Sequence, residues 1–258
     1  MDDVLVEVDG AVPTTPALHH RALANYGHFT ALQVRDASAR GLDLHLDRLR
    51  AASRELFGRE PDAERIRQLL RQALAGTRSA SVRIHVHEDP GGDELSVMVT
   101  VRPPAEMPEH PQRLQTVRYT RPVAHIKHVG TFAQIYYGRT AEQGGFDDAL
   151  LTGPDGALYE TTTANVGFVD DDTVVWPDGP VLTGITQRLI DRHAHDVGLA
   201  TVERPVPPAE LPSFRAAFIA NSLGVAPVGA VDDLELATDP AVLERVRRAY
   251  AAEPWVAV

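Results

Sequence analysis

The sequence contains no cysteine, so the chain forms neither a disulfide nor a thiolate metal site and has no thiol nucleophile. This absence fits a reducing cytoplasm, where we expect the protein to be located. No stretch approaches the roughly 18 uncharged apolar residues of a membrane-spanning helix. The first residues, Met-Asp-Asp-Val-Leu-Val-Glu, lack the basic region and the apolar core of a signal peptide. We therefore expect a cytoplasmic protein without a membrane partner.

Positive charge is also scarce. The formal net charge of −11 argues against a surface that binds nucleic acid or anionic lipid. Hydrophobic residues make up 43% of the chain and charged residues 24%, as is ordinary for a globular protein. The length of 258 residues is enough for two small lobes, each with a core of its own.

Lysine is nearly absent. Lysine and arginine together number 25, and all but Lys127 are arginine. An ε-amine, unlike a guanidinium, can lose its proton and act as a nucleophile, for instance in a Schiff base. Lys127 is therefore a candidate catalytic residue; the alternative is an ordinary surface lysine.

The first part of the chain predicts a small α+β lobe at residues 1–103. We expect strands at 4–8, 29–34, 81–87 and 94–101 and helices at 44–57 and 61–75. The last two strands are expected to form a hairpin around Pro-Gly-Gly-Asp at 90–93. The Pro-rich segment 104–111 is expected to be a stiff linker.

Residues 112–258 predict a larger, strand-rich α/β lobe that carries Lys127. We expect strands near 114–119, 148–152, 157–160, 165–169, 173–176, 202 and 216–219, and helices near 131–144, 184–197 and 240–251. The fold class is thus α+β or mixed α/β.

Two motifs near Lys127 indicate an anion site. Thr-Gly-Ile-Thr at 183–186 opens a helix, where free backbone N–H groups and the helix dipole suit a phosphate. Upstream, Arg48 lies on the polar side of its helix, where it can make a second phosphate contact. The alternatives are a plain helix cap and a solvated arginine.

Several short segments occur together in one order. They are Phe29-Thr30, His45-Leu-Asp-Arg-Leu49, Ile126-Lys127, Gly145-Phe-Asp-Asp-Ala-Leu-Leu151, Glu160 with Asn165, Leu182-Thr-Gly-Ile-Thr186 and Asn221-Ser-Leu-Gly-Val-Ala-Pro-Val228. In this order they resemble the class IV aminotransferase family of pyridoxal-phosphate (PLP) enzymes, also called fold type IV. The family includes D-amino-acid and branched-chain aminotransferases and aminodeoxychorismate lyase. The resemblance spans residues 29–228, most of the chain.

The resemblance implies a two-lobed architecture with the cofactor between the lobes, and a role for each matching residue. Lys127 is expected to form the internal aldimine with PLP and to move the proton at the substrate Cα. Glu160 is expected to face the pyridine nitrogen and keep it protonated, which makes the ring an electron sink. The expected phosphate ligands are Arg48, Ile185, Thr186 and Ser222, with Asn221 beside them. Asn165 supports the turn next to the cofactor, or is purely structural.

The substrate-binding residues depart from the family pattern. Branched-chain members carry a tyrosine five residues after the lysine, where this chain has Phe132. D-amino-acid members often carry an arginine shortly after the strand at 81–87, and here Glu88 is close to that place. Alternate residues of a strand share one face, so the substitutes we expect are Arg83, His85 and His87, with Phe29 and Thr30 nearby and with Arg35 and His28 as weaker candidates.

The resemblance leaves three functions open. The first is a transaminase that moves an amino group from an amino acid or primary amine to a 2-oxo acid through pyridoxamine phosphate. The second is a lyase that splits 4-amino-4-deoxychorismate into 4-aminobenzoate and pyruvate. Thr30 falls near a hydroxyl that lyases use, and Lys127-His128 with Gln134 also looks like a lyase segment. The third is a non-catalytic member that binds PLP or only keeps the fold. By resemblance we also expect a homodimer; we expect no metal and no nucleic-acid partner.

Overall fold

The protein is described by a computed structural model that covers residues 4–89 and 94–258. The hairpin turn predicted at 90–93 lies outside the described residues. The chain divides into two compact units. Unit 1 contains the described residues up to Ala105, the segment Ile126–Gly130 and the C-terminal Pro254–Val258; unit 2 contains Glu106–His125 and Thr131–Glu253.

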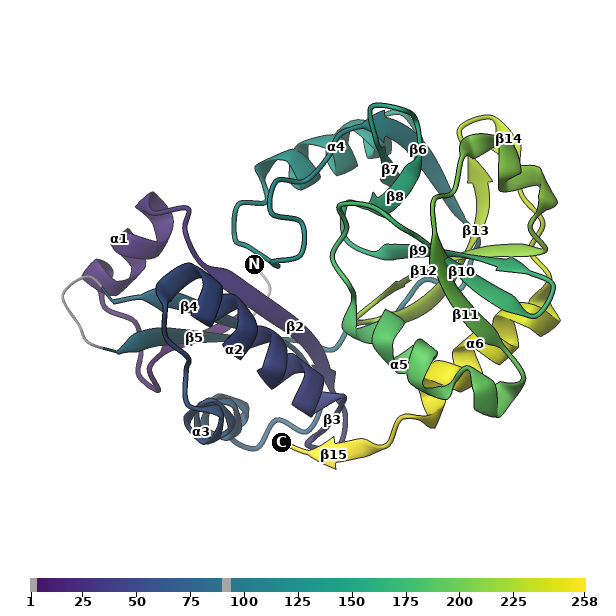
Figure 1. The fold of residues 1–258 in the computed structure, drawn as a ribbon. Coiled ribbons are helices and arrows are strands. Elements are labelled where there is room, and N and C mark those ends of the chain that lie inside the picture. The colour runs from purple at the N-terminus through teal and green to yellow at the C-terminus, as the bar shows by residue number, and fades with distance from the viewer. Residues whose placement is uncertain (1–3, 90–93) are drawn as a thin grey trace. The chain divides into compact units, whose positions relative to one another are not determined.

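Unit 1 is built on an antiparallel sheet in the order β1-β5-β4-β2 (Figure 1). Its elements are β1 (Leu5–Val8), α1 (Thr15–Leu23), β2 (His28–Val34), β3 (Ser38–Arg40), α2 (Leu42–Phe57), α3 (Ala63–Leu74), β4 (Ala80–Glu88), β5 (Leu95–Arg102) and β15 (Trp255–Ala257). Helices α2 and α3 cover one face of the sheet with leucines at helical spacing, and these pack on Val and Ile side chains of the strands. The opposite face carries Phe29 and His85, which are paired across β2 and β4.

Unit 2 contains a larger mixed sheet. Its elements are β6 (Gln112–Arg118), α4 (Phe132–Gln143), β7 (Asp148–Thr152), β8 (Leu158–Thr161), β9 (Asn165–Asp170), β10 (Thr173–Pro177), α5 (Ile185–His193), β11 (Ala200–Arg204), β12 (Ala216–Asn221), β13 (Gly224–Val231), β14 (Leu234–Glu235) and α6 (Pro240–Ala252), with short 3₁₀ helices η1 (His195–Val197) and η2 (Pro208–Ser213).

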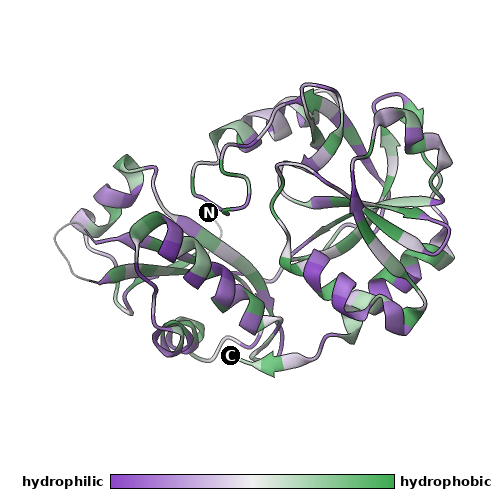
Figure 2. Cartoon of the chain, in the orientation of Figure 1, coloured by the Kyte–Doolittle hydropathy of each residue, from purple (hydrophilic) through white to green (hydrophobic). Residues whose placement is uncertain are grey.

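The strand order of this sheet is β11-β10-β9-β12-β13-β6-β7-β8, with β14 paired to β13. Strand β8 also pairs with β9 through Glu160 and Asn165, so the strands from β9 round to β8 close into a ring. One apolar core lies against residues of these strands, and a second lies under α5 and α6. Figure 2 shows that apolar and polar residues alternate or mix on the strands and helices of both units. The predicted mixed α/β class is confirmed.

Two segments belong to a different unit from the one that the sequence predicted. The sequence assigned Lys127 and the C-terminus to the second lobe, whereas both segments cluster with unit 1. The Phe29 N–H donates to the Lys127 carbonyl at 2.9 Å and the Val129 N–H to the Gly27 carbonyl at 2.9 Å. Strand β15 pairs with β3. These backbone contacts join segments far apart in sequence, so no local pattern predicts them.

Within the described residues, no helix is both long and apolar enough to cross a membrane.

Candidate functional site

The segment that holds Lys127 lies against the start of β2. Its neighbour Ile126 is 2% exposed, which fixes the segment in the unit, while Lys127 itself is half-buried. The Lys127 Nζ lies 5.1 Å from the centre of the Phe29 ring. An ammonium at this distance from an aromatic face is held electrostatically. The amine is therefore positioned next to a buried aromatic side chain.

A buried hydroxyl–imidazole pair lies in the same unit. Thr30 Oγ1 and His45 Nδ1 are hydrogen-bonded at 2.7 Å, and both side chains are buried. Burial, together with smaller effects of the positive charges of Arg48 and Lys127, lowers the pKa of His45 to about 3. The imidazole is therefore neutral at pH 7. Both charges act on it, so the structure brings Arg48 and Lys127 near one histidine that sequence reasoning had treated only as part of a motif.

Strand β4 presents three polar side chains on the face of the sheet opposite the helices, as the alternation predicted. His85 stacks on Phe29 with ring centres 5.1 Å apart, and Arg83 Cζ lies 5.7 Å from the Phe29 centre. His87 follows, 6.5 Å from His85. Burial lowers the pKa of His85 to about 3 and of His87 to about 4, with smaller effects from neighbouring positive groups. Arg83 is thus the charged member of this group.

Thr30 does not belong to that group. Consecutive residues of a strand point to opposite faces. Thr30 therefore lies with His45 on the face that the helices cover, whereas Phe29 lies on the opposite face. The substrate candidates therefore divide into two sets, Phe29, Arg83, His85 and His87 on one face and Thr30 on the other. Of the weaker candidates, His28 is fully buried and hydrogen-bonded to Ser53 at 2.8 Å. Arg35 donates to the Ala105 carbonyl at 2.9 Å.

Unit 2 holds Glu160 in a buried network. Glu160 is 5% exposed, and its Oε1 accepts from Arg121 Nη1 at 2.8 Å. Its Oε2 accepts from the Leu182 N–H at 3.1 Å. Asn165, opposite Glu160 in the β8–β9 pair, donates from Nδ2 to the Leu182 carbonyl at 2.6 Å. The backbone N–H and the carbonyl of Leu182 are therefore each hydrogen-bonded to one of the two predicted site residues, Glu160 and Asn165.

Sequence reasoning missed Arg121. It is six residues before Lys127, but in a chain whose positive residues are almost all arginine nothing distinguished it. Its side chain is 7% exposed, and the ion pair with Glu160 is buried on both sides.

The first turn of α5 has the properties of an anion site. Gly184 is its N-cap and, as a glycine, makes no side-chain cap hydrogen bond. Ile185 and Thr186 are buried, and the first N–H groups of a helix have no partner within it. A Cβ at position 184 would overlap Asn165 Oδ1, so the backbone and Asn165 pack without space for a side chain.

The turn after β12 lies against this helix start. The Thr186 hydroxyl donates to the Asn221 carbonyl at 2.6 Å, and Asn221 Oδ1 accepts from the Leu223 N–H at 2.8 Å. Ser222 lies between Asn221 and Leu223 in the chain and so belongs to this turn. Because the Thr186 hydroxyl donates its hydrogen bond to the Asn221 carbonyl, its observed role is to hold this turn against α5.

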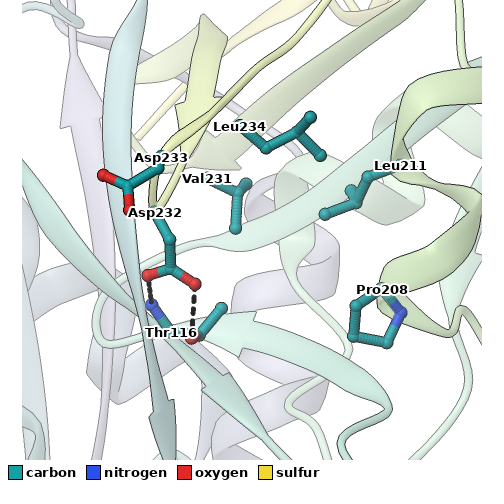
Figure 3. Close-up of a pocket in the computed structure, with 7 residues that line it drawn as sticks. All are labelled: Thr116, Pro208, Leu211, Val231, Asp232, Asp233 and Leu234. Carbon is teal, nitrogen blue, oxygen red and sulfur yellow. Dashed lines mark hydrogen bonds between the residues drawn. The ribbon is translucent and has the colours of Figure 1, made fainter.

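Other features of the molecule are separate from this set. Unit 2 contains a cavity of about 470 Å³ that none of the predicted site residues lines (Figure 3). It is lined by Thr116, Pro208, Leu211, Val231, Asp232, Asp233 and Leu234. The Asp232 carboxylate there accepts two hydrogen bonds from Thr116. Within the described ranges no group of histidine, aspartate and glutamate residues is arranged to hold a metal ion.

The chain belongs to the class IV aminotransferase family. The family model described as amino-transferase class IV matches residues 27–231. This match includes Lys127, Glu160 and the start of α5, and it confirms the predicted family and the prediction of a PLP-dependent enzyme. No curated protein matches the chain.

Solved structures of this family share the fold. A hypothetical aminotransferase from Mycobacterium tuberculosis in its apo form is 22% identical with a TM-score of 0.85, over 96% of this chain and 99% of that one. A fold IV transaminase from Curtobacterium pusillum is 23% identical with a TM-score of 0.80, over 90% of this chain and 86% of that one. A putative 4-amino-4-deoxychorismate lyase from Legionella pneumophila is 20% identical with a TM-score of 0.77, over 88% and 90%. At these identities the likeness confirms the fold and leaves the reaction open.

Proposed function

We propose that the protein is a transaminase that moves an amino group from an amino acid or primary amine to a 2-oxo acid, with pyridoxal phosphate bound covalently to Lys127. The carrying observation is that the family match includes the sequence's single lysine, half-buried beside Phe29. Covalent attachment of an aldehyde requires a primary amine, and no other side chain in the sequence supplies one. The M. tuberculosis aminotransferase has also been solved in PLP-bound form and with α-ketoglutarate and PMP, at 22% and 23% identity.

The residues of unit 2 fit the two ends of such a cofactor. Glu160 is a buried carboxylate with two observed hydrogen bonds. A carboxylate is an acceptor of the kind that a protonated ring nitrogen requires. The N-terminus of α5, next to the Asn221–Ser222 turn, supplies N–H groups and a positive dipole end for the phosphate. In unit 1 we assign Arg48 to the phosphate as well. When bound, PLP supplies an electron sink for the carbanion at the substrate Cα.

Lys127 has a second task in this proposal. With substrate bound, Lys127 Nζ would remove the proton from the substrate Cα and deliver it to the cofactor carbon that keeps the transferred amino group. The neutral His45 and the cationic Arg48 belong to its electrostatic surroundings. The positive charge of Arg48 favours the neutral, basic form of a nearby amine.

The substrate carboxylate is assigned to Arg83. His85 and His87 are neutral at pH 7 because burial holds their pKa values at about 3 and about 4. They offer hydrogen bonds but no charge, whereas Arg83 keeps its guanidinium charge. Phe29, stacked on His85, supplies an apolar wall. Phe132, in place of the tyrosine of branched-chain members, has no hydroxyl to offer.

A second candidate function is the lyase reaction, favoured by Thr30. Its hydroxyl is held by His45 at 2.7 Å in a buried site, and a fixed hydroxyl is the type of group that can transfer a proton during elimination. In this reading the protein splits 4-amino-4-deoxychorismate into 4-aminobenzoate and pyruvate.

A homodimer in the cytoplasm is part of the same proposal. Helix α4 exposes large apolar side chains, with Phe132 at 79%, Tyr136 at 55% and Ile135 at 53% exposure. Clustered apolar exposure of this kind marks interaction surfaces. Light scattering on the purified protein is expected to give twice the chain mass of 28.1 kDa; a monomer would remove this part of the proposal.

Covalent attachment is tested with Lys127→Ala and Lys127→Arg. Wild type is expected to purify with a visible cofactor absorption band, and borohydride reduction is expected to fix the cofactor to the chain by mass. Lys127→Arg keeps the positive charge without a nucleophilic amine, so neither variant is expected to retain a fixed cofactor. A wild-type protein that binds no PLP contradicts the proposed function.

The reaction is tested by mixing the holoenzyme with a panel of D- and L-amino acids and amines, in the absence of acceptor. Conversion of the cofactor to its pyridoxamine form, with release of a keto acid, supports transamination. Release of pyruvate and 4-aminobenzoate from aminodeoxychorismate, without amino transfer to the cofactor, assigns the lyase function instead.

A further inference from the structure

Arg121 is the only arginine among the buried residues of the described chain. It follows β6 in a segment that continues to Lys127, and its guanidinium meets Glu160 at 2.8 Å with both side chains at 7% exposure or less. Isolated buried charges are costly, and charges this deep are kept only where they are paired. Because both side chains are buried, the Arg121–Glu160 pair does not serve to make the protein surface soluble, and the alternative is a role in the site.

We propose that Arg121 is a positioning residue that keeps Glu160 ionised and directs its carboxylate to the ring nitrogen of pyridoxal phosphate. The inference rests on the proposed function, because it concerns the same cofactor. It assigns a role to a residue that neither the motifs nor the family resemblance had identified.

The first step of the argument is orientation. Glu160 Oε1 accepts from Arg121 Nη1, and Oε2 accepts from the Leu182 N–H. Two donors on different oxygens fix the plane of the carboxylate, and each carboxylate oxygen has two lone pairs with which to accept. A further donor, such as a protonated ring nitrogen, then meets an acceptor whose direction is already set.

The second step is the charge state. Burial without a partner raises the pKa of a carboxyl group, and a protonated Glu160 would be able to donate to an unprotonated ring nitrogen. A guanidinium stays charged at any pH that a protein tolerates. At 2.8 Å it stabilises the carboxylate form of Glu160. The proton shared between Glu160 and the ring is therefore kept on the ring nitrogen, where the electron sink needs it.

The test compares Arg121→Met, which keeps the volume without the charge, with Arg121→Lys, which keeps the charge. The probe is pyridoxal phosphate labelled with ¹⁵N in the ring, whose chemical shift reports protonation of the nitrogen independently of activity. In wild type the shift is expected to be that of a protonated nitrogen. In Arg121→Met it is expected to move towards the unprotonated value and to vary with pH, and Arg121→Lys is expected to restore most of the difference.

Two further variants separate positioning from general stability. Arg192→Met removes another arginine from a buried glutamate of unit 2, because Arg192 Nη1 lies 2.9 Å from Glu253, itself 7% exposed. It is expected to leave the ¹⁵N shift unchanged. Glu160→Gln is expected to give the unprotonated shift, and adding Arg121→Met to it is expected to change neither the shift nor cofactor retention on dialysis, since Arg121 acts through Glu160.

The outcomes are distinct. If wild type carries a protonated ring nitrogen and Arg121→Met has the same shift, the inference is wrong while the proposed function stands. If Arg121→Met alters the shift equally in the Glu160→Gln background, Arg121 does not act through Glu160 and the inference is again wrong. If wild type binds no labelled cofactor, the proposed function itself fails. Should Arg121→Met not fold, the Arg121→Lys shift and its pH dependence decide: a wild-type signature supports the charge argument and an unprotonated one overturns it.

Discussion

Gly184 and Asn165 approach so closely that the amide oxygen of Asn165 occupies the space of a Cβ at position 184. The backbone of Gly184 is in an ordinary extended conformation, with φ −67° and ψ 149°, so the restriction is one of space and not of backbone strain. The same Asn165 donates from Nδ2 to the Leu182 carbonyl. Asn165 thus contacts the chain at two points before α5: it packs against Gly184 and donates a hydrogen bond to Leu182.

This packing predicts that Gly184→Ala weakens the phosphate end of the cofactor site. The added methyl must displace Asn165 or the first turn of α5, and overpacking of this kind costs about 1–3 kcal/mol. We expect lower thermal stability and a raised dissociation constant for PLP, measured by fluorescence titration. In the Asn165→Ala background the clash is absent, so Gly184→Ala is expected to cost less there than in wild type. An equal cost in both backgrounds would refute the packing argument.

The Thr186 hydroxyl predicts a second effect at the same helix. Thr186→Val keeps the shape but leaves the half-buried Asn221 carbonyl without this donor, and an acceptor left unsatisfied costs up to about 1–3 kcal/mol. We expect the Asn221–Ser222 turn to loosen and PLP affinity to fall by about tenfold or more. Thr186→Ser keeps the hydroxyl and serves as the control, with near wild-type affinity in the same titration. If both variants bind PLP equally well, the turn does not depend on this bond.

Buried histidines predict a loss of stability in mild acid. Burial is the main cause that lowers the pKa of His45 to about 3 and of His28 to about 4. Both values lie below the ordinary pKa of about 6.5, so the unfolded chain takes up protons first as the pH falls. Their contribution is complete above about pH 6.5 and is lost progressively as the pH falls to about 4 for His28 and to about 3 for His45. For His45 the loss is on the order of a few kcal/mol.

Urea denaturation across pH 4–8 measures this dependence. In His45→Asn the absolute stability falls, and the free energy of unfolding is expected to vary less steeply with pH below about 6.5. His195→Gln changes an exposed histidine and is the control, with an unchanged slope. A wild-type slope in His45→Asn would show that His45 takes up its proton equally in the folded and unfolded states.

The sequence singled out candidate site residues where a residue type was rare or where several short motifs occurred in one order. Lys127 was marked by composition, and Glu160 by its place in an ordered set of motifs. Strand alternation correctly grouped Arg83, His85 and His87 on one face. The same rule, applied to Phe29 and Thr30, would have placed them on opposite faces, as the structure does.

What the sequence could not predict depends on contacts between distant segments. Arg121 pairs with Glu160 across 39 positions, and nothing local distinguishes it from the other arginines. The unit that contains Lys127 is determined by its hydrogen bonds to β2, about 100 positions earlier in the chain. Likewise β15 pairs with β3 from the other end of the chain. Such pairings have no signature within a window of residues.

Arg83 predicts how the enzyme distinguishes its substrates. Its guanidinium lies beside Phe29 on the same face as His85, which is neutral at pH 7. Arg83→Gln removes the charge and keeps hydrogen-bonding groups, so KM for amino acids is expected to rise by about 10–100-fold, the loss of one charge-assisted bond of about 1.5–3 kcal/mol. Primary amines have no carboxylate to lose, so their KM is expected to stay near the wild-type value. Arg83→Lys keeps the positive charge and is the control, with KM for amino acids expected to stay closer to the wild-type value than in Arg83→Gln. Steady-state kinetics on one amino acid and one matched amine decide the matter, and an equal rise of KM for both would show that Arg83 supports the fold of the face and does not bind the carboxylate.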